Sequence, residues 1–218
     1  KLQLISDIES SLTHSHDNPC TICPLAKQKG LTFPSSTSIS TTMFQLIHCD
    51  IWGPFHVQTI NKQRYFLSIV DDYSRTTWIY LMKAKSEVLN LIPSFYNMVL
   101  NQFQVSIKQL RSDNGPEFNL VEFYKDKGII HQLSCVDTPQ QNAIVERKHQ
   151  HLLNVARALR FQSNVPLNLW SECVLTATYL INRLPTPILK NKSHFEVLFE
   201  TKPTYHHLRI FGCLCYAS

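Results

Sequence analysis

The sequence predicts a mixed α/β fold in which a five-stranded sheet is flanked by helices. Three β-compatible segments come first, a helix follows, and the order then continues as strand, helix, strand and helix. This order differs from the regular strand–helix alternation of a doubly wound parallel sheet. The chain has 218 residues, of which 44% are hydrophobic and 17% charged. It can therefore bury a sizeable core, and its length suits one domain with appendages.

The first three strands are predicted from runs of β-branched and aromatic residues. FQLIHCDIW is stopped by a Gly-Pro pair, and YFLSIVDDYSR is followed by TTWIYLMK. The second and third runs are expected to form a hairpin, because Asp71 and Asp72 lie between them and have turn chemistry. We prefer turn capping for these two carboxylates, with a place near a metal site as the alternative.

A helix is predicted over 86–103, because its apolar residues recur at helical spacing and Ser86 can serve as the N-cap. The remaining elements are a strand (107–113), a short helix (120–127) closed by Gly128, a strand (128–135), a long amphipathic helix (142–162) and two further helices (167–183 and 194–200).

Composition excludes several classes of protein. The sequence contains no run of about 18 apolar residues, so no membrane-spanning helix is predicted. The first ten residues lack the basic and apolar regions of a secretory signal. The odd number of cysteines, seven, argues against a disulfide scaffold and favours an intracellular reducing compartment. The net charge of +5 permits an anionic partner such as nucleic acid without establishing one.

Three carboxylates occupy positions from which they can converge. Asp50 lies near the end of the first strand, Asp113 ends the fourth strand, and Glu146 lies in the first turns of the long helix. This set suits two Mg²⁺ ions about 3.5–4 Å apart, because hard divalent cations favour carboxylate oxygens. The alternative is that Glu146 makes only a surface contact, with Gln150 or Arg157.

Several motifs of the sequence resemble the integrase of copia-type LTR retrotransposon Pol polyproteins. The strings that carry the resemblance are DIWGP (50–54), YFLSIVDDYSR (65–75), RSDNGPEF (111–118), TPQQNAIVERKHQHLLNVARAL (138–159) and LRIFGCLCYAS (208–218). The resemblance covers nearly the whole chain and implies a ribonuclease H-like catalytic core. It implies a DDE triad on Asp50, Asp113 and Glu146, which would bind two Mg²⁺ or Mn²⁺ ions.

The resemblance also implies a division of the chain. Residues 1–34 are expected to be a partial pre-integrase zinc-binding segment, and the Ser/Thr-rich stretch 35–43 a linker. The catalytic core is expected over 44–205, and 206–218 would be the start of a truncated C-terminal region.

The implied function is that of a polynucleotidyl transferase, which trims the 3′ ends of element DNA and joins them to target DNA. A catalytically inactive or domesticated DNA-binding protein is one alternative, and a structure-selective nuclease on the same fold is another. The implied partners are DNA and further copies of the chain, with no membrane and no small-molecule substrate. The implied location is intracellular: cytoplasmic particles first, and the nucleus during action on chromosomal DNA.

The long helix is expected to bury an apolar stripe formed by Val145, Leu152, Ala156 and Leu159. Its basic residues are assigned to the polar face: Arg147, Lys148, His149, His151, Arg157 and Arg160. A solvated surface would explain them, but beside a triad that acts on DNA, phosphate contact is an equal alternative. In the integrases that the sequence resembles, the start of this helix meets the DNA ends, which implies as candidate DNA-binding residues Gln141, Asn142, Arg147, Lys148, His151 and Arg157.

Cys20 and Cys23 form a CxxC motif that resembles half of the family's zinc site. The histidine pair of that site would precede Lys1, so Zn²⁺ is expected in an intact parent protein rather than in this segment. The other cysteines are expected to be core residues: Cys49, Cys135, Cys173, Cys213 and Cys215.

Three further polar residues have expected places. His48 and His131 lie in predicted strands and are expected to be core histidines with satisfied hydrogen bonds. Glu117 either assists near the triad or caps the following helix, and we prefer the cap.

Overall fold

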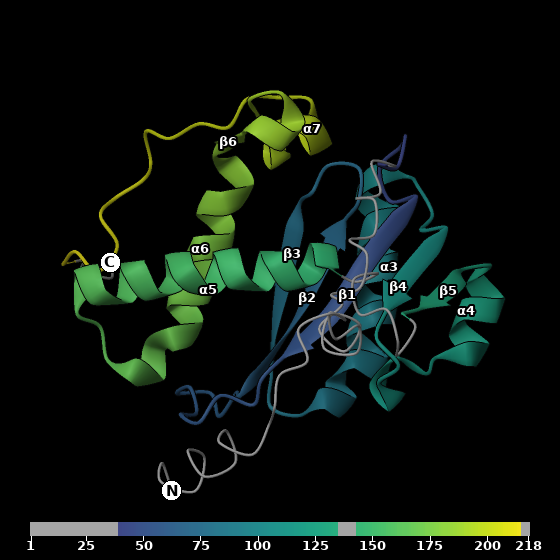
Figure 1. Ribbon diagram of the computed structural model, residues 1–218, viewed down its shortest axis with the longest axis horizontal. Coiled ribbons are helices and arrows are strands. Elements are labelled where there is room, and N and C mark those ends of the chain that lie inside the picture. Colours follow the sequence, from purple (N-terminus) through teal and green to yellow (C-terminus); the bar gives the residue numbers. More distant parts are fainter. Residues whose placement is uncertain (1–38, 135–142, 215–218) are drawn as a thin grey trace, which may run out of the picture. The chain divides into compact units, whose positions relative to one another are not determined.

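The computed structural model describes residues 39–134 and 143–214. Its central element is a five-stranded sheet with the strand order β3-β2-β1-β4-β5 (Figure 1). The strands are β1 (Leu46–Trp52), β2 (Tyr65–Asp71), β3 (Thr77–Met82), β4 (Gln109–Ser112) and β5 (Ile130–Leu133). The pairs β1–β2 and β2–β3 are antiparallel, whereas β1–β4 and β4–β5 are parallel. The predicted mixed five-stranded sheet is confirmed.

The helices follow the predicted order. They are α3 (Val88–Phe103), α4 (Val121–Lys127), α5 (Ala143–Ser163), α6 (Trp170–Arg183) and α7 (His194–Phe199). Two short strands precede α7 and pair with each other: β6 (Pro185–Thr186) and β7 (Lys192–Ser193). The sequence did not predict them. Short 3-10 turns lie at Lys85–Glu87, Pro116–Phe118, Leu167–Leu169 and Pro187–Leu189. Gly128 ends α4 in the left-handed conformation, as expected.

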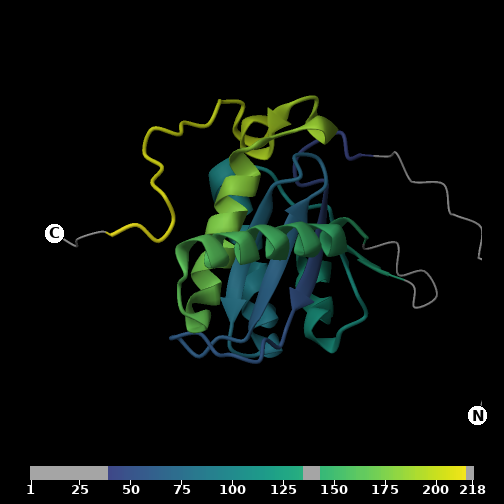
Figure 2. The same ribbon diagram turned by 60° about the vertical axis from the view of Figure 1, so that its left-hand side comes forward.

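Each face of the sheet has its own hydrophobic core, because side chains alternate along the strands. On one face Ile47, Cys49 and Leu67 pack with residues of α3. On the other face Phe66 packs with Leu152 of α5 and with residues of α6. Figures 1 and 2 show α5 and α6 crossing this second face, with α3 on the opposite side of the sheet.

The end of β1 is set by Gly53. Its φ is +126°, a conformation that residues with a side chain rarely adopt. A Cβ atom placed there would lie 2.6 Å from the carbonyl oxygen of Arg64. The chain turns at this point, and the amide of Phe55 donates a 2.7 Å hydrogen bond to that same carbonyl. The predicted stop of the first strand is therefore confirmed and has a steric cause.

Some local predictions were wrong. Ser86 does not cap α3, because it lies inside a 3-10 turn and α3 begins after Glu87. The carboxylate of Glu87 instead accepts hydrogen bonds from the backbone amides of Lys83 and Ala84, at 2.6 and 2.9 Å. Cys213 is exposed rather than part of a core.

Other predictions for cysteines and for the termini have mixed outcomes. Cys49 and Cys173 are buried, as expected. Several predictions lie outside the described residues: those for the segment 1–34 with Cys20 and Cys23, and those for Cys135, Gln141, Asn142 and Cys215. No helix among the described residues is long and apolar enough to cross a membrane.

Candidate active site

Asp50 and Asp113 lie on neighbouring strands at the same level of the sheet. β1 pairs in parallel with β4, and His48 stands opposite Arg111. The same register, continued by two residues, brings Asp113 beside Asp50. Asp113 follows the last residue of β4 and accepts a 3.1 Å hydrogen bond from the amide of Gly115 through Oδ1. The sheet topology thus brings these two predicted residues together.

Glu146 approaches the same place from α5. It lies in the first turn of this helix, which packs across β1 and β2. Burial is the main cause that raises the pKa of Asp50 to about 7, and the hydrogen bond from the Ile51 amide opposes it. The negative charges of Asp113 and Glu146 raise the pKa of Asp50 further, whereas the charge of Lys85 lowers it. The three carboxylates therefore lie close enough to interact electrostatically.

The alternative surface contact of Glu146 with Arg157 is not formed among the described residues. The guanidinium of Arg157 donates instead to the carbonyl of Leu153 and to the side chain of Asn154. Both Glu146 and Asp113 are exposed, and the side chain of Asp50 is 19% exposed.

As a donor set, three carboxylates fit a hard divalent cation such as Mg²⁺ or Mn²⁺. Asp50 is the rigid member, because both of its carboxylate oxygens have a protein neighbour. Within residues 39–134 and 143–214, no three His, Cys, Asp or Glu side chains are already arranged to hold one metal ion.

Glu117 lies beside Asp113 and does not cap α4, so the preferred prediction for it was wrong. The N-cap of α4 is Leu120, and it makes no side-chain hydrogen bond. Glu117 Oε1 lies 3.2 Å from Nζ of Lys85. A Cβ atom on Gly115 would stand 2.8 Å from Cδ of Glu117 and 3.0 Å from Oδ1 of Asp113. A side chain at position 115 would therefore require these two flexible carboxyl groups to shift.

His149 was wrongly assigned to the polar face of the long helix. The structure buries it, with Nδ1 3.4 Å from Oδ2 of Asp50 and Nε2 2.5 Å from Oγ of Ser68. Burial lowers the pKa of His149 to about 4, so the ring is neutral at pH 7. Helical spacing could have placed it correctly, because it follows Val145 by four residues and precedes Leu152 by three. The predicted apolar stripe itself is confirmed.

The other basic residues of α5 have different surroundings. Arg147, His151 and Arg157 are exposed. Lys148 is half-buried, and its ammonium donates to Nε2 of His194 at 3.2 Å. Burial, together with the charge of nearby Arg75, lowers the pKa of Lys148 to about 8. Burial and the charge of Lys148 lower the pKa of His151, so Arg147 and Arg157 are the exposed cations among these four residues.

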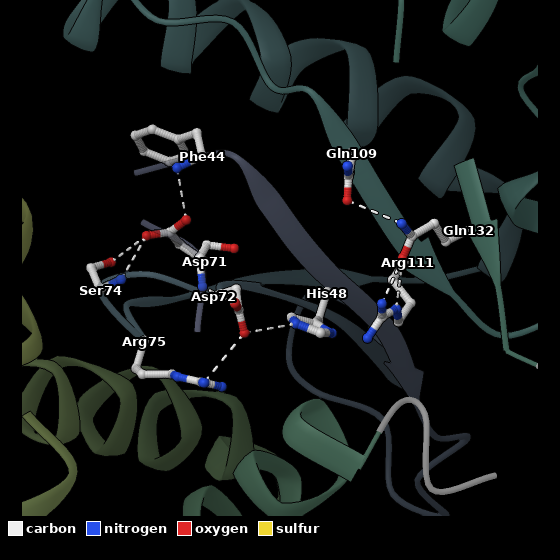
Figure 3. A network of polar contacts seen from close by, with 10 residues as sticks. Phe44, His48, Asp71, Asp72, Ser74, Arg75, Gln109, Arg111 and Gln132 are labelled. Carbon is white, nitrogen blue, oxygen red and sulfur yellow. Dashed lines mark hydrogen bonds and ion pairs between the residues drawn. The ribbon is translucent and has the colours of Figure 1, made fainter. Parts of the chain in front are cut away.

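Asp71 organises the turn between β2 and β3, as preferred from the sequence. Its Oδ1 accepts a 2.8 Å hydrogen bond from the amide of Phe44. Its Oδ2 accepts from both the amide and the hydroxyl of Ser74, at 2.9 and 2.7 Å (Figure 3). These bonds tie the turn to the segment that enters β1.

Asp72 is the centre of a buried polar cluster. Its Oδ1 lies 3.2 Å from Nε2 of His48 and 3.3 Å from the guanidinium of Arg75 (Figure 3). His48 is buried as predicted, but its Nδ1 has no hydrogen-bond partner among the residues that the structure describes. His131 is half-buried, and its Nε2 lies 2.9 Å from the hydroxyl of Ser112.

Comparisons with known sequences agree with this geometry. A family model described as the integrase core domain matches residues 40–139. The Pol polyprotein of transposon RE1 from Arabidopsis thaliana is 39% identical over 90% of the chain, and that of transposon RE2 is 38% identical over 90%. The polyprotein of transposon TNT 1-94 from Nicotiana tabacum is 32% identical over 91%. The chain spans only 13%, 14% and 15% of these polyproteins, respectively.

Two solved structures share the fold. One is a simian T-cell lymphotropic virus intasome in complex with the PP2A regulatory subunit B56 gamma, with a TM-score of 0.58 and 18% identity over 83% of this chain and 60% of that one. The other is the HTLV-2 integrase catalytic core domain in complex with magnesium, in a trimeric form, with a TM-score of 0.51 and 17% identity over 70% of this chain and 95% of that one. The expected ribonuclease H-like fold is thus confirmed, and the chain belongs to the family of integrase core domains of copia-type retrotransposon Pol polyproteins.

Proposed function

We propose that this chain is the catalytic core of a retrotransposon integrase, which processes the 3′ ends of element DNA and joins them to target DNA. The observation that carries the proposal is the convergence of Asp50, Asp113 and Glu146 at one end of the sheet. The register of β1 and β4 supports it, and so does the effect of the other two carboxylates on the pKa of Asp50. Family membership adds independent support.

The three carboxylates would hold two Mg²⁺ or Mn²⁺ ions, which when bound acidify the attacking hydroxyl and stabilise the leaving oxygen. Asp50 supplies a fixed ligand, and the exposed side chains of Asp113 and Glu146 can rotate to complete the set. In the first step, water attacks a phosphodiester and the P–O3′ bond breaks, leaving a 3′-hydroxyl on the element strand. In the second step, this hydroxyl attacks a target phosphodiester, a new P–O bond forms, and a target 3′-hydroxyl leaves.

DNA is proposed to run along the start of α5. The exposed side chains of Arg147, His151 and Arg157 would contact phosphates, together with Gln141 and Asn142, which lie outside the described residues. Lys148 is proposed to add its positive charge to this surface from a half-buried position.

The remaining parts of the proposal concern the longer protein. Cys20 and Cys23 would provide half of a Zn²⁺ site that upstream histidines complete. Several copies of the chain would assemble on the DNA ends, since each reaction involves two ends and one target. Such a protein would pass from cytoplasmic particles to the nucleus to reach chromosomal DNA.

A strand-transfer assay with Mn²⁺ tests the function. The full chain should join a labelled 3′-hydroxyl oligonucleotide to a target duplex, and Asp113→Asn should abolish the joined product. Glu122→Gln is the matched control, because Glu122 is an exposed carboxylate in the first turn of α4 and should be dispensable. Joining that survives Asp113→Asn would contradict the proposal. DNA binding without cleavage would favour an inactive DNA-binding protein, and cleavage without joining would favour a nuclease.

A further inference from the structure

We infer that His149 is a positioning residue for Asp50: the imidazole, held by Ser68, sets the orientation in which the Asp50 carboxylate receives a divalent cation. The inference rests on the proposed function, because it concerns one of the same three carboxylates. Nothing in the family match assigns a role to this histidine.

The sheet register creates the place that His149 occupies. Asp50 on β1 and Ser68 on β2 are direct cross-strand partners, so both side chains point to the face that α5 covers. His149 descends from the first turns of α5 onto this pair and is only 8% exposed. Phe66, two residues before Ser68, packs edge-on against the imidazole at a centroid distance of 5.4 Å. Sheet and helix together hold the ring in one place.

Each oxygen of the Asp50 carboxylate has its own neighbour. Oδ1 accepts a 2.9 Å hydrogen bond from the amide of Ile51, and Oδ2 lies 3.4 Å from Nδ1 of His149. The second distance is longer than a usual N–H···O hydrogen bond, so it is an electrostatic contact. The two contacts involve different oxygens of the carboxylate and restrict its rotation.

The hydroxyl of Ser68 sets the tautomer of the ring. It lies 2.5 Å from Nε2 of His149 and 3.3 Å from the carbonyl oxygen of Asp50. We assign the hydroxyl proton to Nε2, because this leaves the ring proton on the nitrogen that faces the Asp50 carboxylate. The proton of the neutral ring then lies on Nδ1, next to the carboxylate. The other tautomer would turn a lone pair toward Asp50, which is repulsive.

The row of Asp50, His149 and Ser68 contains the residue types of a hydrolase triad but not its function. Ser68 is fully buried within the sheet, so no substrate can reach its hydroxyl. The order of action is the reverse of that in a hydrolase triad: Ser68 orients His149, and His149 orients the carboxylate of Asp50. Residues that hydrogen-bond to metal ligands commonly tune metal affinity in this way.

Mn²⁺ affinity of the full chain, measured by calorimetry without DNA, tests this role. His149→Ala should weaken Mn²⁺ binding by about 10–100-fold. His149→Asn should bind close to wild type, because its amide nitrogen can occupy the position of Nδ1. His149→Gln should resemble His149→Ala, because its amide reaches toward Ser68 instead. Ser68→Ala, which keeps the ring but removes the proton donor, should weaken binding to an intermediate degree.

His194→Ala is the matched control, since it removes an equally buried imidazole away from Asp50. It should lower the melting temperature without changing Mn²⁺ affinity. If Asp50→Asn leaves Mn²⁺ binding unchanged, the proposed metal site itself fails. If Asp50→Asn abolishes binding while folded His149→Ala and Ser68→Ala bind as wild type, only the positioning role is overturned. Equal weakening by His149→Asn and His149→Ala would also overturn it, because loss of packing would then explain both.

Discussion

The ammonium of Lys148 lies 3.2 Å from Nε2 of His194 and joins the start of α5 to α7. Lysine can only donate here, so Nε2 accepts and the proton of the ring lies on Nδ1, 2.9 Å from the carbonyl of Ile181. Burial, followed by the charge of Lys148, lowers the pKa of His194 to about 4. His194 is therefore neutral in the folded protein at pH 7.

This relationship predicts that acid destabilises the fold through His194. Between pH 6.5 and about 4 the unfolded chain binds a proton at this histidine and the folded chain does not. The free energy of unfolding should fall across this window, with a contribution from His194 on the order of 2–3 kcal/mol. Urea unfolding at several pH values measures it.

His194→Asn should be less stable at pH 7 and should show a shallower dependence on pH between 6.5 and 4. His206→Asn is the control, because His206 is exposed, and it should keep the wild-type dependence. Parallel curves for His194→Asn and wild type would exclude His194 as the source of the effect.

The order of elements could be predicted because its signals are local. The β2–β3 hairpin, the stop of β1 at Gly53 and the end of α4 at Gly128 depend on residues next to each other in the sequence. The three carboxylates proposed as the triad are indicated by recognisable motifs around them and by the scarcity of carboxylates in the sequence. The approach of Asp113 to Asp50 needed only the parallel pairing of β1 with β4, which the mixed α/β order allows, whereas Glu146 also needed the packing of α5 across β1 and β2.

The neighbours of the site could not be predicted in the same way. Ser68 and His149 are 81 positions apart, and Lys148 and His194 are 46 apart, so only the tertiary fold brings them together. A histidine among basic residues was assigned to the polar face by its residue type. The spacing of His149 from Val145 and Leu152 places it on the buried face of the helix, and this is where the structure has it.

Asp72 is predicted to be a stability residue rather than a metal ligand. Burial alone would raise its pKa, but hydrogen bonds from His48 and the Ser40 amide, with the Arg75 guanidinium, hold the pKa of Asp72 well below its usual range. Asp72→Asn should lower the free energy of unfolding by about 3–5 kcal/mol, because it leaves the largely buried guanidinium of Arg75 without its carboxylate partner. Urea unfolding at pH 7 measures this loss.

Asp126→Asn provides the comparison for Asp72, because Asp126 is exposed and forms an ion pair with the adjacent Lys127. It should leave stability unchanged. A folded Asp72→Asn variant should keep its Mn²⁺ affinity. If its affinity drops as far as that of Asp50→Asn, the alternative that Asp72 belongs to the metal site is correct.

Gly53→Ala is predicted to be strongly destabilising. A side chain at this φ of +126° is strained by about 1–3 kcal/mol, and its Cβ would also overlap the carbonyl of Arg64. Gly128→Ala is the matched control, since its φ is +66° and, in the described part of the chain, no atom beyond its own neighbours in the sequence lies within 4 Å of the added Cβ. It should cost about 1 kcal/mol. Similar losses in thermal unfolding for both variants would show that the close approach to Arg64 is unimportant.

Metal affinity is predicted to depend on pH through Asp50. Its pKa is raised to about 7, and the carboxylate must be deprotonated to bind a cation. Mn²⁺ affinity should therefore fall by up to about tenfold per pH unit as the pH drops below 7, and level off above it. The charge of Lys85 lowers the pKa of Asp50, so Lys85→Met should move the start of this fall to higher pH. Lys83→Met, which removes a neighbouring exposed cation, should leave it in place. Constant affinity from pH 5 to 8, or equal shifts for both lysine variants, would show that protonation of Asp50 does not control metal binding.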